Sequence, residues 1–119
     1  SDVCSSDLVN YSIAEPQAES RLLRVAAERG VAVIINRPFA EGAMFARVRG
    51  KPLPGFAADI GASSWAQLFL KWILGHPAVT CVIPGTRSAT HVVDNLGAAT
   101  GALPDTALRK RIADAFRAL

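Results

Sequence analysis

Apolar residues follow two patterns along the chain, one typical of strands and the other of helices. Short runs, rich in β-branched and small apolar residues, lie at residues 9–13, 31–35 and 79–83. Runs of this length with little alternation are typical of parallel strands that are covered on both faces. The sequence therefore predicts three buried strands.

Between and after these runs, apolar residues recur three and four positions apart, as they do on one face of a helix. We expect helices at residues 15–29, 43–49, 65–75, 88–96 and 103–119, and a proline- and glycine-rich loop at 50–55. Gly30 is a candidate left-handed cap for the first helix. Ser63 or Ser64 is the expected N-terminal cap of the third.

The repeats also predict which side chains face the interior. The expected inward residues are Leu22, Leu23, Ala26 and Ala27, then Trp65, Leu68, Phe69, Trp72 and Ile73, and finally Leu108, Ile112, Ala115, Phe116 and Leu119. Arg109, Lys110 and Arg111 are expected largely outside. His76 follows the third helix, where the helix dipole favours a cation.

The order strand, helix, strand is that of βαβ units and predicts the α/β class. The chain has 119 residues, whereas a complete (β/α)8 barrel needs about 250. It is therefore either a compact small fold or a piece of a larger one, and we expect a piece.

Charge, cysteines and hydropathy exclude several classes of function. The formal charge is +3, and the basic residues are scattered rather than interleaved with aromatic ones, so we expect no nucleic-acid partner. The two cysteines form no disulfide framework, and Cys81 is expected to be a small buried hydrophobe. No apolar run reaches the length of a membrane span. Without a signal-peptide pattern, a cytoplasmic location is the default expectation.

Candidate chemistry lies in VTCVIPGTRSATHVVDNL, residues 79–96, a predicted strand, turn and helix. Gly85 allows a sharp turn and a close approach to a ligand. The helix carries Ala89, Val92, Val93 and Leu96 on one face and Arg87, His91, Asp94 and Asn95 on the other. Free amides at a helix start, together with an arginine, suit a phosphate. An ordinary amphipathic helix with a solvated polar face fits the same spacing.

The segment VIPGTRSATHVVDNLGAA resembles the last strand, turn and cofactor helix of aldo-keto reductases. In that family an Ile-Pro-Gly turn precedes a helix that ends in an acidic residue, Asn and Leu. The resemblance includes Asn10-Tyr11-Ser12, residues 31–42 and SWAQLFLKWILGHP, so it extends from Val9 to about Ala99. It implies the last three strand-helix units of a (β/α)8 TIM barrel plus a C-terminal helix.

The resemblance also implies NADP(H) as the cofactor and a small carbonyl compound as the substrate. Gly85, Thr86 and Arg87 would contact the adenosine phosphate, with Arg87 on the 2′-phosphate. His91, Asp94 and Asn95 would line the adenine side. Arg37 would lie near the pyrophosphate, while Asn36 stands where the family has an aromatic residue that stacks on the nicotinamide.

Residues 1–8, SDVCSSDL, are polar and unpatterned and resemble a translated sequencing adapter. We expect them to be a non-native scar and 9–119 to be the C-terminal fragment of the barrel. In the family a glutamine that contacts the nicotinamide amide precedes Val-Asn-Tyr-Ser. Leu8 occupies that position here, so we expect one cofactor contact to be missing.

The family's catalytic tyrosine, lysine, aspartate and histidine lie on preceding strands, and no motif for them occurs in this chain. The single tyrosine, Tyr11, matches the Asn-Tyr-Ser segment and is not a candidate general acid. We therefore expect no catalytic residue, no metal site and no activity from the fragment alone. Two alternatives remain open: a non-catalytic NADP(H)-sensing barrel, and a small α/β interaction module.

Overall fold

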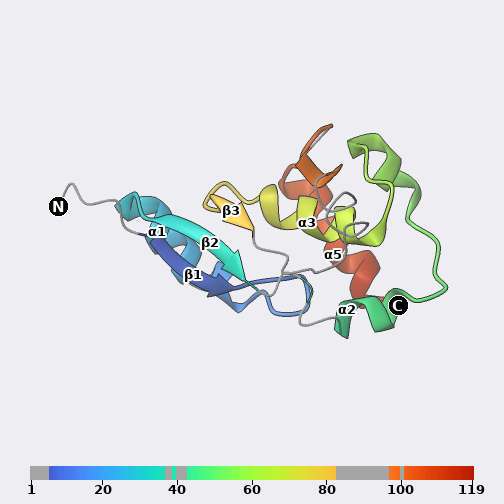
Figure 1. Cartoon of the computed structure of the whole chain (residues 1–119), viewed down its shortest axis with the longest axis horizontal. Helices are drawn as coiled ribbons and strands as arrows, with labels where there is room; N and C mark the ends of the chain where they lie inside the picture. The colour runs from blue at the N-terminus through green and yellow to red at the C-terminus, as the bar shows by residue number, and fades with distance from the viewer. Residues whose placement is uncertain (1–5, 37–38, 40–42, 83–96, 100) are drawn as a thin grey trace.

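The computed structural model describes residues 6–36, 39, 43–82, 97–99 and 101–119. Three parallel strands form one sheet in the order β1 (Ser6–Asn10), β2 (Ala32–Asn36) and β3 (Cys81–Val82) (Figure 1). The helices are α1 (Leu22–Arg29), α2 (Ala43–Val48), α3 (Trp65–Leu74) and α5 (Thr106–Arg117). The chain thus has an α/β fold, and the parallel sheet with its crossover helices confirms the predicted class.

The register of the sheet places the carboxyl ends of its strands at one edge. Asn10 pairs with Asn36, and Ile35 pairs with Val82. Thr80 holds β3 in place, because its amide donates to the Val33 carbonyl at 2.9 Å and its Oγ1 accepts from the Val33 amide at 3.1 Å. Every segment that follows a strand therefore starts from the same edge.

The first helical segment is interrupted. A 3₁₀ helix at Gln17–Ser20 precedes α1, so the predicted continuous helix from residue 15 is wrong. Leu23 and Ala26 face the core as expected, whereas Leu22 and Ala27 are exposed. Gly30 has φ 70°, which confirms the left-handed cap.

Helix α3 is the centre of the core. Ser64 caps it through its Oγ, which accepts from the Gln67 amide at 3.1 Å. Phe69 lies at the centre of a group of rings, with centroids 5.5 Å from Phe116 and 5.7 Å from Trp65. The predicted inward stripe of α3 is confirmed, with Trp65 the only one of its five residues that is partly exposed.

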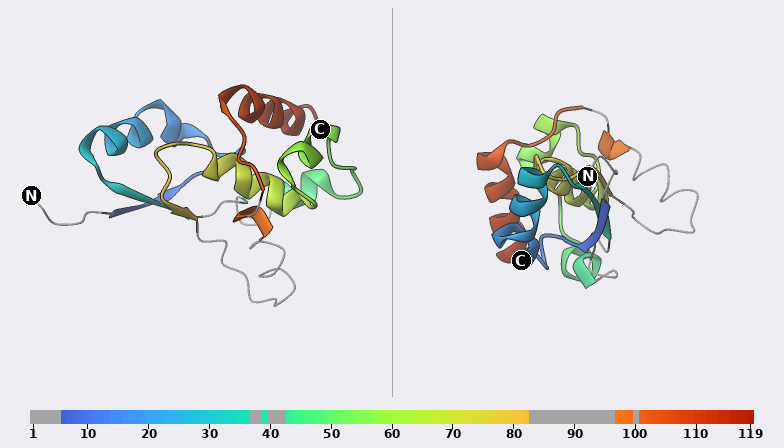
Figure 2. Two further views of the ribbon diagram at one scale, coloured as in Figure 1. Left: turned by 90° about the horizontal axis from the view of Figure 1, so that it is seen from above. Right: turned by 90° about the vertical axis from the view of Figure 1, so that its left-hand side faces the viewer.

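Helices α1 and α5 lie on the same side of the sheet, as both views in Figure 2 show. Asp105 caps α5, since its Oδ1 accepts from the Leu108 amide at 2.8 Å. The buried residues of α5 are Arg109, Ile112, Ala113 and Phe116, while Leu119 is exposed. Ile112 and Phe116 are thus buried as expected, and Leu108 and Ala115 are half-buried, but the prediction that Arg109 lies outside is wrong.

Two further expectations differ from the structure. Cys81 is exposed rather than buried, because β3 is an edge strand of the described sheet and no described strand continues beyond it. β1 begins at Ser6 and ends at Asn10, not at 9 and 13. Strand pairing uses backbone groups that every sequence supplies, so it does not test the origin of residues 1–8, which stays a prediction.

Candidate functional site

The carboxyl edge of the sheet is the origin of the predicted cofactor segments. In the sequence, Arg37 directly follows the last residue of β2, and Pro84-Gly85, the predicted turn, comes two residues after Val82, the end of β3. In parallel α/β proteins, ligands bind at this edge. The structure brings together the points from which both segments start.

The predicted cofactor residues themselves lie outside the described residues. These are Arg37, Gly85, Thr86, Arg87, His91, Asp94 and Asn95. Their contacts with NADP(H) therefore stay a prediction. In the described ranges, no group of three or more His, Cys, Asp or Glu side chains gathers in a way that would hold a metal ion.

A polar cluster that sequence reasoning missed, with Tyr11 and Arg109 buried and Glu19 partly exposed, follows the carboxyl end of β1. Arg109 Nη2 donates to the Tyr11 hydroxyl at 2.7 Å and to Glu19 Oε1 at 3.1 Å. The Tyr11 hydroxyl donates to the same Glu19 oxygen at 2.6 Å. The spacing of Arg109 from Ile112 and Phe116, three and seven residues, was a signal for this cluster, because it puts the arginine on the apolar stripe.

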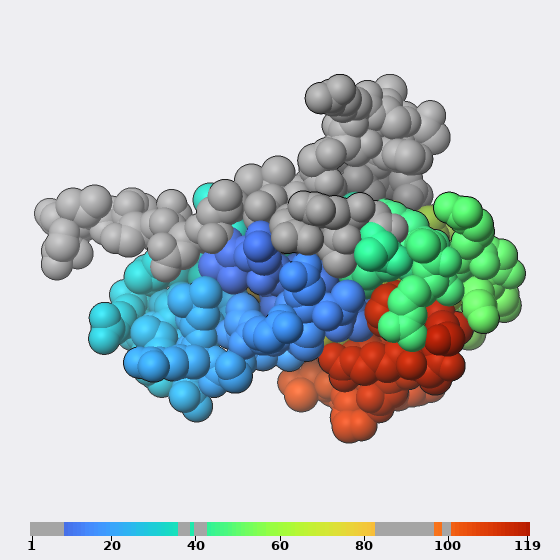
Figure 3. All heavy atoms as spheres, turned by 90° about the horizontal axis from the view of Figure 1, so that it is seen from below, coloured from blue at the N-terminus to red at the C-terminus, as the bar shows by residue number. Residues whose placement is uncertain are grey.

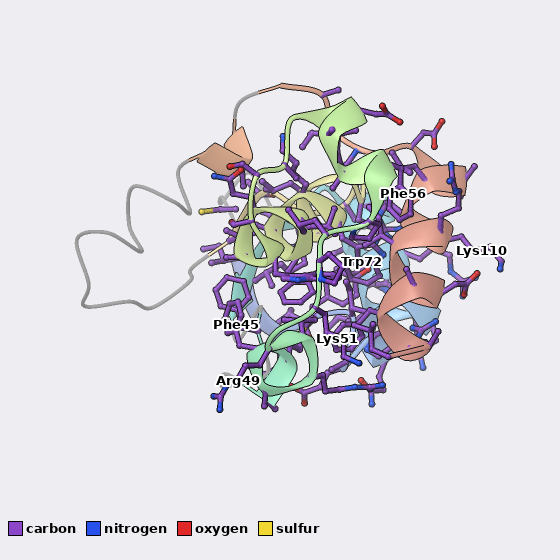
Figure 4. All side chains as sticks on the ribbon, turned by 90° about the vertical axis from the view of Figure 1, so that its right-hand side faces the viewer. Phe45, Arg49, Lys51, Phe56, Trp72 and Lys110 are labelled. Carbon is purple, nitrogen blue, oxygen red and sulfur yellow. The ribbon has the colours of Figure 1, made fainter. Side chains whose placement is uncertain are left out.

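Helix α3 completes the cluster through Trp72. Arg109 Nε donates to the Trp72 carbonyl at 2.8 Å, and Trp72 Nε1 donates back to the Arg109 carbonyl at 3.0 Å. The guanidinium carbon lies 4.4 Å from the centroid of the Trp72 ring. In Figure 4, Trp72 lies inside the molecule, whereas Lys110, the next residue after Arg109, points outward.

Tyr11 is unsuited to proton donation. Its side chain is fully buried, and burial followed by the hydrogen bond to Glu19 raises the pKa of the phenol well above its usual range. A general acid needs access to the substrate and a pKa near the working pH. The structure thus places Tyr11 in the core, and the expectation that it is not a general acid stays a prediction.

Two other titratable groups have lowered pKa values. Burial, and then the charge of Arg109, lowers the pKa of His76, whose Nδ1 accepts from the Ala78 amide at 3.1 Å. Burial and Arg109 thus favour the neutral imidazole, whereas the position at the helix end led us to expect a favoured cation. Burial also lowers the pKa of Lys71, whose Nζ donates to the Ala102 carbonyl at 3.1 Å.

Comparison with known proteins identifies the family. The model of the aldo/keto reductase family matches residues 4–111, which is most of the chain. The chain belongs to the aldo/keto reductase family. No curated protein sequence matches it. In the described ranges, no helix is long and apolar enough to cross a membrane.

Solved structures of aldo-keto reductases have the same fold. One from Klebsiella pneumoniae, in complex with NADP and acetate, has a TM-score of 0.74 at 24% identity, and the match covers 95% of this chain and 40% of that chain. One from Bacillus halodurans, in its holo form, has a TM-score of 0.67 at 24% identity, with 98% and 43% covered. The chain thus spans about two fifths of the length of these reductases and has the fold of part of their barrel.

Proposed function

We propose that this aldo/keto reductase chain supplies the adenosine-phosphate side of an NADP(H) site in a longer enzyme. That enzyme interconverts a small carbonyl compound and its alcohol. The family match over residues 4–111 is the observation that carries the proposal. The Ile-Pro-Gly motif in the sequence after β3 resembles the family's cofactor turn. β2 and β3 end at the same edge of the sheet, which supports a cofactor site there.

The residues of the proposed site have the chemistry that a phosphate needs. Gly85 and Thr86 offer backbone amides and a hydroxyl, and Arg87 offers a guanidinium that pairs with two phosphate oxygens at once. His91, Asp94 and Asn95 would contact the adenine and its ribose, and Arg37 would contact the pyrophosphate. The bound nicotinamide supplies the hydride, while these residues bind and orient the cofactor.

We also propose that residues 9–119 are the C-terminal fragment of the barrel, that residues 1–8 are foreign to it, and that no residue of this chain is catalytic. The 119-residue chain is then inactive by itself. The test has two parts: the coding sequence upstream of Val9 is read, and carbonyl reduction with NADPH is assayed for the complete protein and for this chain. We expect an upstream tyrosine and lysine pair, activity in the complete protein and none in the chain. Cofactor-dependent reduction by the 119-residue chain would contradict the proposal.

The two alternatives give different results in the same experiments. An NADP(H) sensor would show no upstream tyrosine and lysine pair and would bind the cofactor without turnover. A small interaction module would be a monomer that unfolds cooperatively. The sheet of the described chain has β1 and β3 as edges, and open edges promote self-association. We therefore expect the isolated chain to self-associate in analytical ultracentrifugation.

A further inference from the structure

Four separate parts of the chain meet at Arg109. The side chain contacts Tyr11 after β1, Glu19 in the 3₁₀ helix before α1, and Trp72 in α3. Tyr11 and Glu19 precede Arg109 by 98 and 90 residues. Figure 3 shows the segment after β1 and α5, in blue and red, side by side on the surface. One arginine therefore joins the beginning of the described fold to its last helix.

Arg109 is buried, so the loss of its hydrogen bonds would lower the stability of the fold. Its side chain is 11% exposed, and that of Glu19 is 35% exposed. When a buried guanidinium loses its hydrogen-bond partners, it stays out of water without compensation, and this lowers the stability of the fold. Loss of one contact is therefore expected to weaken the other two. The planar donor group of arginine fits this role, because Nε bonds α3 while Nη2 bonds Tyr11 and Glu19.

The Tyr11 ring packs against Trp72 and orients the Tyr11 hydroxyl. Its centroid lies 5.1 Å from that of Trp72, so the ring is held between α3 and the hydroxyl's polar partners. One residue further, Ser12 closes a turn with Glu15: the Glu15 amide donates to the Ser12 carbonyl at 3.1 Å, and the Ser12 amide donates to the Glu15 carbonyl at 3.2 Å. The packing of Tyr11 thus helps to set the path of the chain after the carboxyl end of β1.

We propose that Tyr11, Glu19 and Arg109 form a latch that couples the docking of α5 to the conformation of the segment that follows β1. Release of α5 frees residues 11–19, and displacement of that segment loosens α5 by the same free energy, because coupling is reciprocal. Helix α5 then helps to hold the segment that leaves the carboxyl end of β1.

The test is hydrogen–deuterium exchange of the 119-residue chain, read by mass spectrometry on peptides over residues 11–19, 26–31 and 106–117. Arg109→Met removes the donors and keeps an apolar stem. We expect exchange in 11–19 and in 106–117 to rise about tenfold, as the loss of bonds to a charged group implies. Exchange in 26–31, at the far end of α1, should not change.

Arg111→Met is the matched control, because Arg111 lies on the same helix, is exposed and packs on Phe56 instead of the latch. It should leave exchange in residues 11–19 unchanged. Tyr11→Phe removes one oxygen and keeps the ring, so it tests the latch even if Arg109→Met fails to fold. We expect it to speed exchange in 106–117 as well as in 11–19.

Two results would overturn the latch. One is faster exchange confined to α5 in Arg109→Met, and the other is unchanged exchange in α5 in Tyr11→Phe. Arg109→Lys separates charge from geometry: it keeps the cation beside Glu19 but cannot reach Tyr11 and the Trp72 carbonyl together. We expect it to restore only part of the protection. This outcome does not depend on NADP(H), so the latch and the proposed function can fail independently.

Discussion

The helix layer and the far edge of the sheet are held in different ways. Helix α3 is buried along almost its whole length and contacts a cluster of rings through Phe69 and the Arg109 side chain through Trp72. β3, by contrast, has two residues and an exposed cysteine, and Thr80 supplies part of its pairing. Buried contacts are thus concentrated in the helices, while the proposed cofactor segment follows the shortest strand of the described sheet.

The largest effect should come from the ring cluster. Phe69→Ala removes a buried ring that contacts four others, and truncations of this kind cost about 3–5 kcal/mol. Val82→Ala in β3 removes less apolar surface from a partly buried site and should cost about 1 kcal/mol. Thermal unfolding of the complete protein, followed by circular dichroism, compares the two. Equal losses would mean that stability is shared evenly between helices and edge.

A smaller effect on stability is expected where Gly101 packs closely against Ile60. Gly101 and Gly50 both have φ +75°, but a Cβ on Gly101 would lie 2.9 Å from the Ile60 carbonyl oxygen, whereas the space at Gly50 is open. Gly50→Ala should cost about 1 kcal/mol for the left-handed backbone alone. Gly101→Ala should cost more, because the contact adds to that strain. The same melting experiment measures both, and equal costs would show that the close packing at Gly101 is unimportant.

The smallest effect expected is a dependence of stability on pH. The pKa of His76 is lowered in the folded chain from its usual 6.5, so the unfolded state binds the proton more readily. Stability contributed by the neutral imidazole is present above pH 6.5 and is lost as the pH falls through the lowered value. His76→Gln should flatten this part of the stability profile. An unchanged slope in that variant would assign the dependence to other groups.

Local patterns predicted local features well. The left-handed Gly30, the Ser64 cap and the stripe of α3 each depend on residues within a few positions, and all three are confirmed. Arg109 was misplaced because charged residues were assumed to be exposed. Its partners Tyr11 and Glu19 lie in a distant part of the sequence, where no periodicity reports them.

Predictions that depend on the rest of a sheet were less successful. Cys81 was expected to be buried because its strand was assumed to be covered on both faces, but β3 is an edge in the described chain. The candidate site was predicted from a turn motif, which names individual residues without any knowledge of the rest of the sheet. Its residues at 37 and 85–95 lie outside the described ranges, so their roles depend on the family resemblance and the proposal above.

The most direct test of the account is the affinity of the complete protein for NADPH and NADH, measured by fluorescence titration in wild type and Arg87→Ala. The account predicts that the variant loses about ten- to a hundredfold in affinity for NADPH, because a charge-assisted pair with the 2′-phosphate disappears, and little for NADH. Arg29→Ala, an exposed arginine at the end of α1, should change neither. Equal losses for both cofactors in Arg87→Ala would contradict the proposed phosphate site.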